Sequence, residues 1–372
     1  MDSLRSLGWW FSISNNLESL NPVHVTLKLF GVMIYTVVDR VNCRLEVTLG
    51  DWILVAIYAT SRIYGMFDGF ANQKWQMLIE SDLPATVYGM AYTIFFIVLM
   101  MTVMPFYLLL LHRRYEHLLQ LLDEFDLETT GYFLISPTAL AIIFAITFIS
   151  RDYSYVWDTV LFLAVFTISC FASMSQHSGL NVMILAIDSR MQLMNRVIRT
   201  MLEPTDMTVG QQKDLVMKLA KSFDRLCDAT ENVNLVLCAP NFFNFINIFF
   251  LHVIACYACT RVFLNQAAPK ETTNSLLYLS WSGFFNLFVF QTITFAAGLR
   301  RKTANFAGAV HRCLNQPHNR SIIDRLQQLS EQIDNREPVI TFFLFELQPS
   351  LIIQAASELA TYMLILIQFE MQ

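Results

Sequence analysis

Long apolar stretches alternate with polar segments along the chain. A membrane-spanning helix needs about 20 mostly apolar residues, and the sequence contains seven windows of this kind. They lie near residues 50–67, 84–111, 132–149, 155–187, 241–264, 276–299 and 349–369. The second and fourth windows are longer than one bilayer crossing requires, so we expect these helices to project beyond the membrane. The pattern predicts an all-α polytopic membrane protein.

The basic residues between the windows predict which side each loop faces. Lys and Arg accumulate in cytoplasmic loops, and here they accumulate in residues 1–49, 112–131, 188–240 and 300–338. The intervening loops hold one each: Lys74, Arg151 and Lys270. We therefore expect a cytoplasmic N-terminus and, after seven transmembrane helices, an extracellular C-terminus.

Two cytoplasmic segments carry the apolar spacing of amphipathic helices. The first contains Leu215, Leu219, Phe223, Leu226, Val233 and Leu237, and the second contains Ile322, Leu326, Leu329 and Ile333. We expect the two helices to pack on each other and form a base beneath the bundle, where subunits can meet. The alternative is a docking face for a soluble partner.

Two shorter apolar segments fit a membrane span less well. Residues 24–38 are interrupted by Lys28, so we expect a re-entrant, interfacial or packed helix there. Residues 337–348, EPVITFFLFELQ, indicate a separate apolar helix or half-helix that breaks from the last one near Gln348 and Pro349. Proline suits the first turn of a helix, because its missing N–H needs no partner there.

These patterns divide the chain into four parts. Residues 1–49 form a cytoplasmic N-terminal segment, in which we expect no cleavable signal peptide. Residues 50–299 form a six-helix transmembrane bundle with a ligand pocket and cytoplasmic helical extensions. Residues 300–348 form cytoplasmic anchor helices, and residues 349–372 form the last helix.

Composition agrees with a membrane protein. Hydrophobic residues make up 55% of the chain and charged residues 15%, against about 25% charged in an ordinary soluble domain. The net charge of −5 indicates no nucleic-acid partner. The seven cysteines are scattered and suggest no disulfide framework. No catalytic triad or phosphate loop points to an enzyme or a cofactor.

The last window carries a polar stripe. Gln354, Glu358, Thr361, Gln368 and Gln372 join Ile365 in steps of three and four, which keeps them on one helix face. Polar groups facing lipid are costly, and an intramembrane carboxylate is by default a functional hypothesis. The stripe could line a pore shared by copies around a symmetry axis, or pack against other helices of its own subunit. In a pore, Glu358 would form a ring that favours cations, and Ile365 and Phe369 an apolar constriction beside Gln368.

A motif at the end of the chain adds a more specific signal. It consists of Thr361-Tyr362, five hydrophobic residues and Gln368-Phe369, and is preceded by FFLFELQPSLI. This pattern resembles the C-terminal signature of the insect gustatory receptor family, with Glu346 where Asp is commoner. Related odorant receptors usually end differently.

The resemblance implies a homotetrameric, tastant-gated, non-selective cation channel in the plasma membrane of sensory-neuron dendrites. Its last helix would line the pore, with Ile365, Gln368 and Phe369 in the gate region, and its cytoplasmic helices would form the tetrameric anchor. The implied partners are a small-molecule tastant, permeant cations, membrane lipids and further copies of the chain, or relatives in a heteromer.

The resemblance also implies a tastant pocket in the outer half of each subunit. Candidate lining residues at that depth are Tyr88, Tyr92, Trp157, His252, Tyr257, Tyr278, Trp281 and Phe285. Each could instead belong to the interfacial aromatic belt or the core. Tyr278 and Trp281, three residues apart, are the best pair. The set has no acidic residue and few amides, which favours an apolar or bitter-type ligand over a sugar.

Three other interpretations compete with this one. His252, Cys256 and Cys259 share a helix face, but close helix contacts explain them better than a metal site. A G-protein-coupled receptor also has seven helices, but in the opposite orientation, and its Asp-Arg-Tyr and Asn-Pro-x-x-Tyr motifs are missing. A transporter could use Glu358 as an ion site, but no duplicated half is visible.

Overall fold

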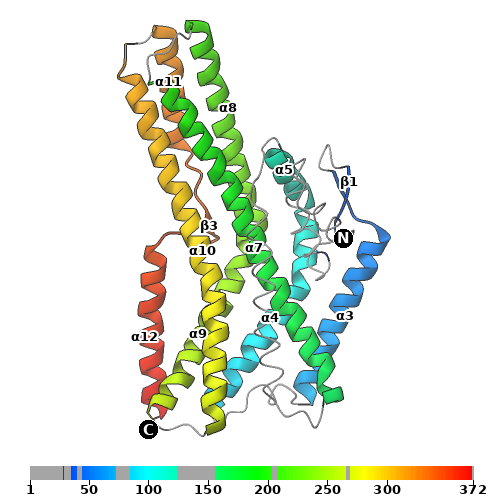
Figure 1. The fold of residues 1–372 in the computed structure, drawn as a ribbon. Coiled ribbons are helices and arrows are strands. Elements are labelled where there is room, and N and C mark those ends of the chain that lie inside the picture. Colours follow the sequence, from blue (N-terminus) through cyan, green and yellow to red (C-terminus); the bar gives the residue numbers. More distant parts are fainter. Residues whose placement is uncertain are drawn as a thin grey trace, which may run out of the picture.

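The described part of the chain is almost entirely helical (Figure 1). The computed structural model describes Lys28 and residues 35–39, 44–72, 84–123, 156–202, 208–264, 269–317 and 319–370. Its helices are α3 (Leu49–Ala71), α4 (Pro84–Leu110), α5 (His112–Asp123), α7 (Val156–Thr200), α8 (Val209–Val233), α9 (Ala239–Phe263), α10 (Pro269–Leu314), α11 (Arg320–Asn335) and α12 (Ser350–Glu370). Two antiparallel ribbons pair β1 (Thr36–Asp39) with β2 (Arg44–Glu46) and β3 (Thr341–Phe342) with β4 (Phe345–Glu346). The all-α class expected from the sequence is confirmed.

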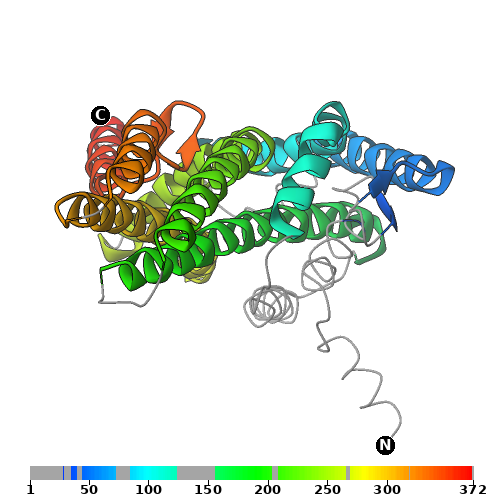
Figure 2. The ribbon, with the colours of Figure 1, turned by 90° about the horizontal axis from the view of Figure 1, so that it is seen from above.

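The helices define two ends of an elongated subunit. α8 and α11 gather with one half of α7 and of α10 at the upper end of Figure 1, which we call the anchor end. α3, α4, α9 and α12 extend toward the opposite end (Figure 1). Seen from above, α12 lies at one edge of the molecule and α3 at the other, with α7 running between them (Figure 2).

Six of the seven predicted windows lie in described helices, namely α3, α4, α7, α9, α10 and α12. The window at 132–149 lies outside the described residues. α7 has 45 residues, or about 68 Å at 1.5 Å per residue, so it extends beyond a hydrocarbon core of about 30 Å, as predicted. α4 has 27 residues, or about 40 Å, so it also exceeds the hydrocarbon core, as predicted, before the chain turns at Leu111 and continues as α5.

Within the described helices, four stretches are long and apolar enough to cross a membrane by length and composition. They are Ala91–Leu110, Val209–Phe263, Tyr278–Leu314 and Ser350–Gln368. α3 and α7 were expected to be transmembrane helices as well. Neither α3 nor the part of α7 whose side chains are described, 168–200, reaches this degree of apolarity. α3 carries Asp51, Arg62 and Asp68.

The described side chains of α7 include polar ones, and the fold buries them. Gln176, His177 and Asn181 are between 1% and 5% exposed. The hydroxyl of Thr292 on α10 donates to Asn181 Oδ1 at 2.6 Å. A helix enclosed by its neighbours can carry polar groups that a lipid-facing helix cannot. These polar residues are therefore compatible with α7 as a membrane helix.

A π-helical turn, η2 (Asn234–Cys238), joins α8 to α9 without a loop. Pro240 follows this turn, and its ring supplies no N–H to the helical hydrogen-bond ladder. The Tyr107 hydroxyl of α4 donates to the carbonyl of Leu235 at 2.6 Å, inside the turn. α4 therefore contacts the junction between the anchor end and the rest of the bundle.

The prediction that the two amphipathic segments pack on each other is confirmed. They form α8 and α11, which lie side by side (Figure 1). The apolar positions at their contact are at most 5% exposed: Leu219, Phe223, Leu226, Val233, Leu237, Ile322, Leu326, Leu329 and Ile333. Leu215 is partly buried beside them. The rings of Phe223 and Phe306 of α10 stack at 5.8 Å, so α10 completes this core.

Residues 337–348 contain a β-hairpin, so the prediction of an apolar helix or half-helix there is wrong. Pro338 disfavours helix at the residue before it and offers no N–H itself, and three β-branched residues follow. The turn holds Phe343 at φ 48°, in the left-handed region. The predicted break near Pro349 is confirmed, since α12 begins at Ser350.

The hairpin is held by side chains far away in the sequence. Asn234 in η2 donates through Nδ2 to the carbonyl of Val339 at 2.7 Å and accepts through Oδ1 from the N–H of Thr341 at 3.0 Å. The ring of Phe345 lies 5.7 Å from that of Phe245 on α9. Asn234 thus pairs with this backbone as a neighbouring strand would, which stabilises an extended chain.

The stretch at 24–38 also differs in part from its prediction. Thr36–Asp39 is strand β1, paired with β2, rather than helix. Three successive β-branched residues favour a strand there. Tyr35, fully buried, stacks on Tyr115 of α5 at 6.1 Å. Apart from Lys28 and these strand residues, the stretch lies outside the described residues.

Arg336 links the end of α11 to α8. Its guanidinium donates to Asp224 at 2.9 Å, Asp228 at 2.6 Å and Glu231 at 2.6 Å. These acceptors are spaced to lie on one face of α8. Hydrogen bonds to Glu231 and Asp228 raise the pKa of Arg336 above its usual range, so this arginine stays charged.

Arg336→Ala should lower the free energy of unfolding by about 1–2 kcal/mol, because charge-assisted hydrogen bonds are lost from a partly exposed network. The midpoint of thermal unfolding of the purified protein measures this loss. Lys221→Ala, which removes an exposed cation from α8 that is outside this network, is the matched control. Equal midpoints for the two variants would contradict the assignment.

Candidate functional site

The polar stripe of the last helix lies on the outside of the subunit. α12 stands along one side of the molecule and packs on α9 (Figures 1 and 2). The exposed side chains of the stripe are Gln354, Glu358, Thr361 and Gln368, and Ile365 between them is 41% exposed. Among the described residues, no other helix of the subunit covers these side chains, which favours the pore interpretation over packing within the subunit. Gln372 and the side chain of Phe369 lie outside the described residues.

The inner face of α12 borders a cavity. This cavity of about 210 Å³ lies between α9, α10 and α12. α12 contributes small and aliphatic side chains to it, including Leu351, Ala355 and Leu359. α9 and α10 contribute three aromatic rings: Phe245, Phe249 and Phe290. An incompletely filled apolar space thus lies behind α12, the candidate pore-lining helix.

Two polar side chains reach the wall of this cavity, His252 of α9 and Asn286 of α10. Asn286 Nδ2 lies 3.0 Å from His252 Nδ1 and also donates to the carbonyl of Ser282 at 2.7 Å. The Ser282 hydroxyl contacts the same ring nitrogen. His252 therefore belongs to a polar bridge between α9 and α10.

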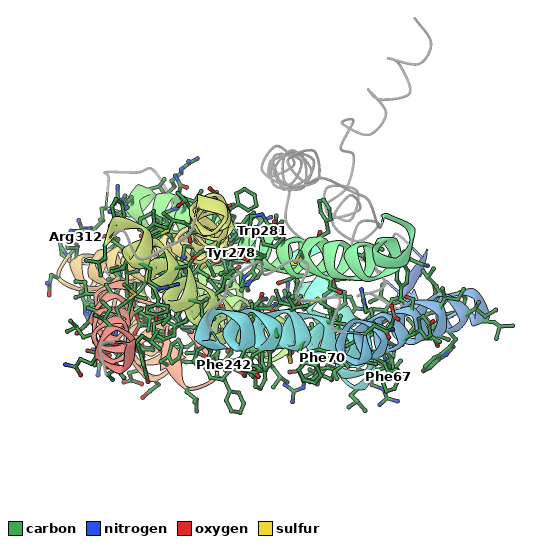
Figure 3. The ribbon with its side chains drawn as sticks, turned by 90° about the horizontal axis from the view of Figure 1, so that it is seen from below. Phe67, Phe70, Phe242, Tyr278, Trp281 and Arg312 are labelled. Atoms are coloured by element: carbon green, nitrogen blue, oxygen red, sulfur yellow. The ribbon has the colours of Figure 1, made fainter. Side chains whose placement is uncertain are left out.

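The ligand candidates on α10 lie close to this bridge in sequence. Tyr278 and Phe285 are 4% and 3% exposed, and Trp281 packs partly buried beside the same core. Figure 3 shows Tyr278 and Trp281 close together on α10. Ser282, which contacts His252, lies four residues after Tyr278 and therefore on the same face of α10.

The other candidates are spread more widely. Tyr88 and Tyr92 are 68% and 46% exposed on α4, and the Tyr92 ring meets that of Phe250 edge-on at 5.9 Å. Tyr257 is 3% exposed in α9. Trp157 starts α7, but its side chain lies outside the described residues. The structure thus does not bring all eight candidates to one place.

The sequence alone did not predict five residues at this site: Asn286, Ser282 and the three cavity phenylalanines. One signal was present: Asn286 is an amide within an apolar helix, four residues after Ser282 and on the same face. The three cavity phenylalanines carry no such signal, because the chain contains 31 phenylalanines spread along its length.

The cysteines near His252 form separate contacts. Cys256 Sγ lies 3.6 Å from His252 Nε2, whereas the Cys259 thiol donates to the carbonyl of Ser275 on α10 at 3.4 Å. Among the described residues, no group of three His, Cys, Asp or Glu side chains could hold a metal ion. Cys259 contributes to the contact between α9 and α10.

A family model described as "7tm Chemosensory receptor" matches residues 20–372. No curated protein sequence matches the chain significantly. The family is one of receptors rather than enzymes, in agreement with the sequence prediction.

Among solved structures, the fold is similar to the insect olfactory receptor OR5 from Machilis hrabei in complex with eugenol. That match has a TM-score of 0.68 at 14% identity and covers 94% of this chain and 97% of that one. A second structure of the same receptor matches with a TM-score of 0.56 at 13% identity over the same shares of both chains. At this identity the likeness concerns the fold.

Proposed function

Because the chain belongs to the 7tm chemosensory receptor family, we propose that it is a gustatory receptor that acts as a ligand-gated, non-selective cation channel. The exposed polar face of α12 carries the proposal. Four subunits would place these faces around a central pore in the plasma membrane. The remainder of each subunit would bind the ligand.

The need of the polar α12 side chains for water supports a pore. Exposed Gln354, Glu358, Thr361 and Gln368 would be costly against acyl chains. One helix cannot enclose an aqueous path, whereas copies related by a closed rotation can. Repeated around that axis, Glu358 gives an acidic ring that attracts cations, and Ile365, with Gln368 and Phe369, narrows the path.

The proposed orientation follows the basic loops. The anchor end, with α8 and α11, would lie in the cytoplasm together with the N-terminus, and seven helices would cross the membrane. α12 would then run outward from Ser350, so Ile365 and Gln368 would lie near its outer end. The anchor helices would hold neighbouring subunits together, in a homomer or with related receptors.

The proposed ligand is a small organic tastant of apolar or bitter type. The motif Thr361-Tyr362 to Gln368-Phe369 favours a gustatory role, and Tyr278, Trp281 and His252 are the candidate contacts whose placement supports a shared site. An odorant-type ligand is the second candidate, since the similar olfactory receptor has a structure in complex with eugenol.

Glu358→Gln should reduce the cation-to-chloride permeability ratio several-fold, because each lost charge is worth about 1 kcal/mol at pore distances in water. Gln368→Ala should alter gating. Patch recordings of cells expressing the chain measure both. Glu331→Gln, an exposed substitution on α11, is the matched control. Wild-type selectivity and gating in both α12 variants would count against the pore.

Trp281→Ala should weaken the ligand response at least about tenfold, which corresponds to about 1.4 kcal/mol of lost contact. Concentration–response curves measure the shift for any active tastant, with surface expression quantified in the same cells. Trp52→Ala, on the exposed side of α3, is the control. An unchanged curve for Trp281→Ala removes this residue from the ligand site.

Tags at the two termini test the orientation. In intact cells, an antibody should reach a C-terminal tag but not an N-terminal one, because the basic loops stay in the cytoplasm. The opposite result would favour a G-protein-coupled receptor and contradict the proposed channel topology.

A further inference from the structure

The cavity behind α12 has the properties of a small-molecule site. Its walls come from three helices distant in sequence, α9, α10 and α12, so it exists only in the folded subunit. Binding sites are typically concave and apolar, with a few placed polar groups. Here the apolar walls are joined by one imidazole and one carboxamide.

The size and charge of the cavity restrict its occupant. A cavity of 150 Å³ holds benzene, so about 210 Å³ leaves room for one ring with a small substituent. The side chains that line it include no Asp, Glu, Lys or Arg, so a charged molecule would lack a counter-ion. Phe245, Phe249 and Phe290 offer ring edges and faces to an aromatic guest.

The hydrogen bonds of His252 leave it able to donate a hydrogen bond to an oxygen of such a guest. Asn286 Nδ2 and the Ser282 hydroxyl both approach His252 Nδ1, which assigns Nδ1 as the acceptor and places the proton on Nε2. Nε2–H meets Cys256 Sγ at 3.6 Å. Because sulfur is a weak acceptor, a ligand oxygen would bind this N–H more strongly.

We propose that the cavity between α9, α10 and α12 binds a neutral, single-ring aromatic molecule with one hydrogen-bonding oxygen, and that its occupancy shifts the position of α12. The effect on α12 rests on the proposed channel function, whereas binding does not. A guest that fits one position of α12 better than another moves the equilibrium between them. Of the ligand candidates, His252 lines this cavity, whereas Tyr278 and Trp281 do not.

A lipid acyl chain explains the cavity less well. It would fill the apolar space but leave the His252–Asn286 pair facing hydrocarbon, at a cost in unsatisfied hydrogen bonding. The phenolic oxygen of 4-methylphenol can serve that pair, which makes this compound the appropriate probe. Toluene has the same ring without the oxygen.

Binding can be measured by the reactivity of a cysteine placed in the cavity. In Ala355→Cys, 4-methylphenol at ten times its Kd should slow modification by methyl methanethiosulfonate about tenfold, because only the unoccupied fraction reacts. α12 contains no native cysteine, so mass spectrometry of its peptide reports this thiol alone. Ala360→Cys, exposed on another side of α12, should react at the same rate with and without 4-methylphenol.

The polar end is tested by comparing the two guests. In Ala355→Cys combined with Asn286→Val, protection by 4-methylphenol should weaken toward that by toluene, while toluene protection persists and reports an intact cavity. Equal protection by 4-methylphenol with and without Asn286 would overturn the role of the polar pair. Protection by decane but not by 4-methylphenol would assign the cavity to acyl chains and overturn the proposal.

Currents test the effect on α12 separately. If the chain conducts, 4-methylphenol should change the wild-type current, and Ala355→Phe, which fills the cavity, should abolish that change. Ala360→Phe should retain it. Protection without a change in current would overturn only the proposed shift of α12. If the chain conducts no current but protection is intact, the result counts against the proposed function rather than the site.

Discussion

The cost of placing polar groups against lipid is the constraint on which the rest of this structure depends. α12 presents Gln354, Glu358, Thr361 and Gln368 on one exposed face, while its opposite face rests on α9 and the cavity. α7 meets the same constraint differently, because Gln176, His177 and Asn181 are buried inside the subunit. α7 thus keeps these polar groups away from lipid, whereas those of α12 face outward. Under the proposed function, a shared pore would supply the water that these groups require.

Long-range hydrogen bonds and ion pairs hold the connection into α12. Arg336 fixes the end of α11 to three carboxylates of α8, and Asn234 pairs with the hairpin backbone. Arg300 of α10 then donates to Glu346 at 3.0 Å and to Gln348 at 3.5 Å, just before α12 begins. A displacement of α10 would therefore be transmitted to the start of α12. The cavity lies farther along the same pair of helices, so both contacts bear on the position of the last helix.

Local periodicity made much of this fold predictable, and long-range contacts account for the rest. The apolar spacing that buries Leu219, Phe223, Leu326 and Leu329 is visible in short windows, so α8 and α11 could be predicted together with their contact. The hairpin at 341–346 could not, because Asn234 stabilises it from more than 100 residues away. The polar stripe of α12 was also readable, since steps of three and four define a helix face. The cavity was not, because it needs three helices in place before Asn286 and His252 meet.

Imaging the purified full-length protein in lipid nanodiscs, at a resolution that places helices, tests the central claim most directly. The account predicts four copies around an axis, with α12 of each copy innermost and Glu358 turned toward the axis. A monomeric particle, or an assembly in which α12 lies at the lipid-facing periphery, would contradict it.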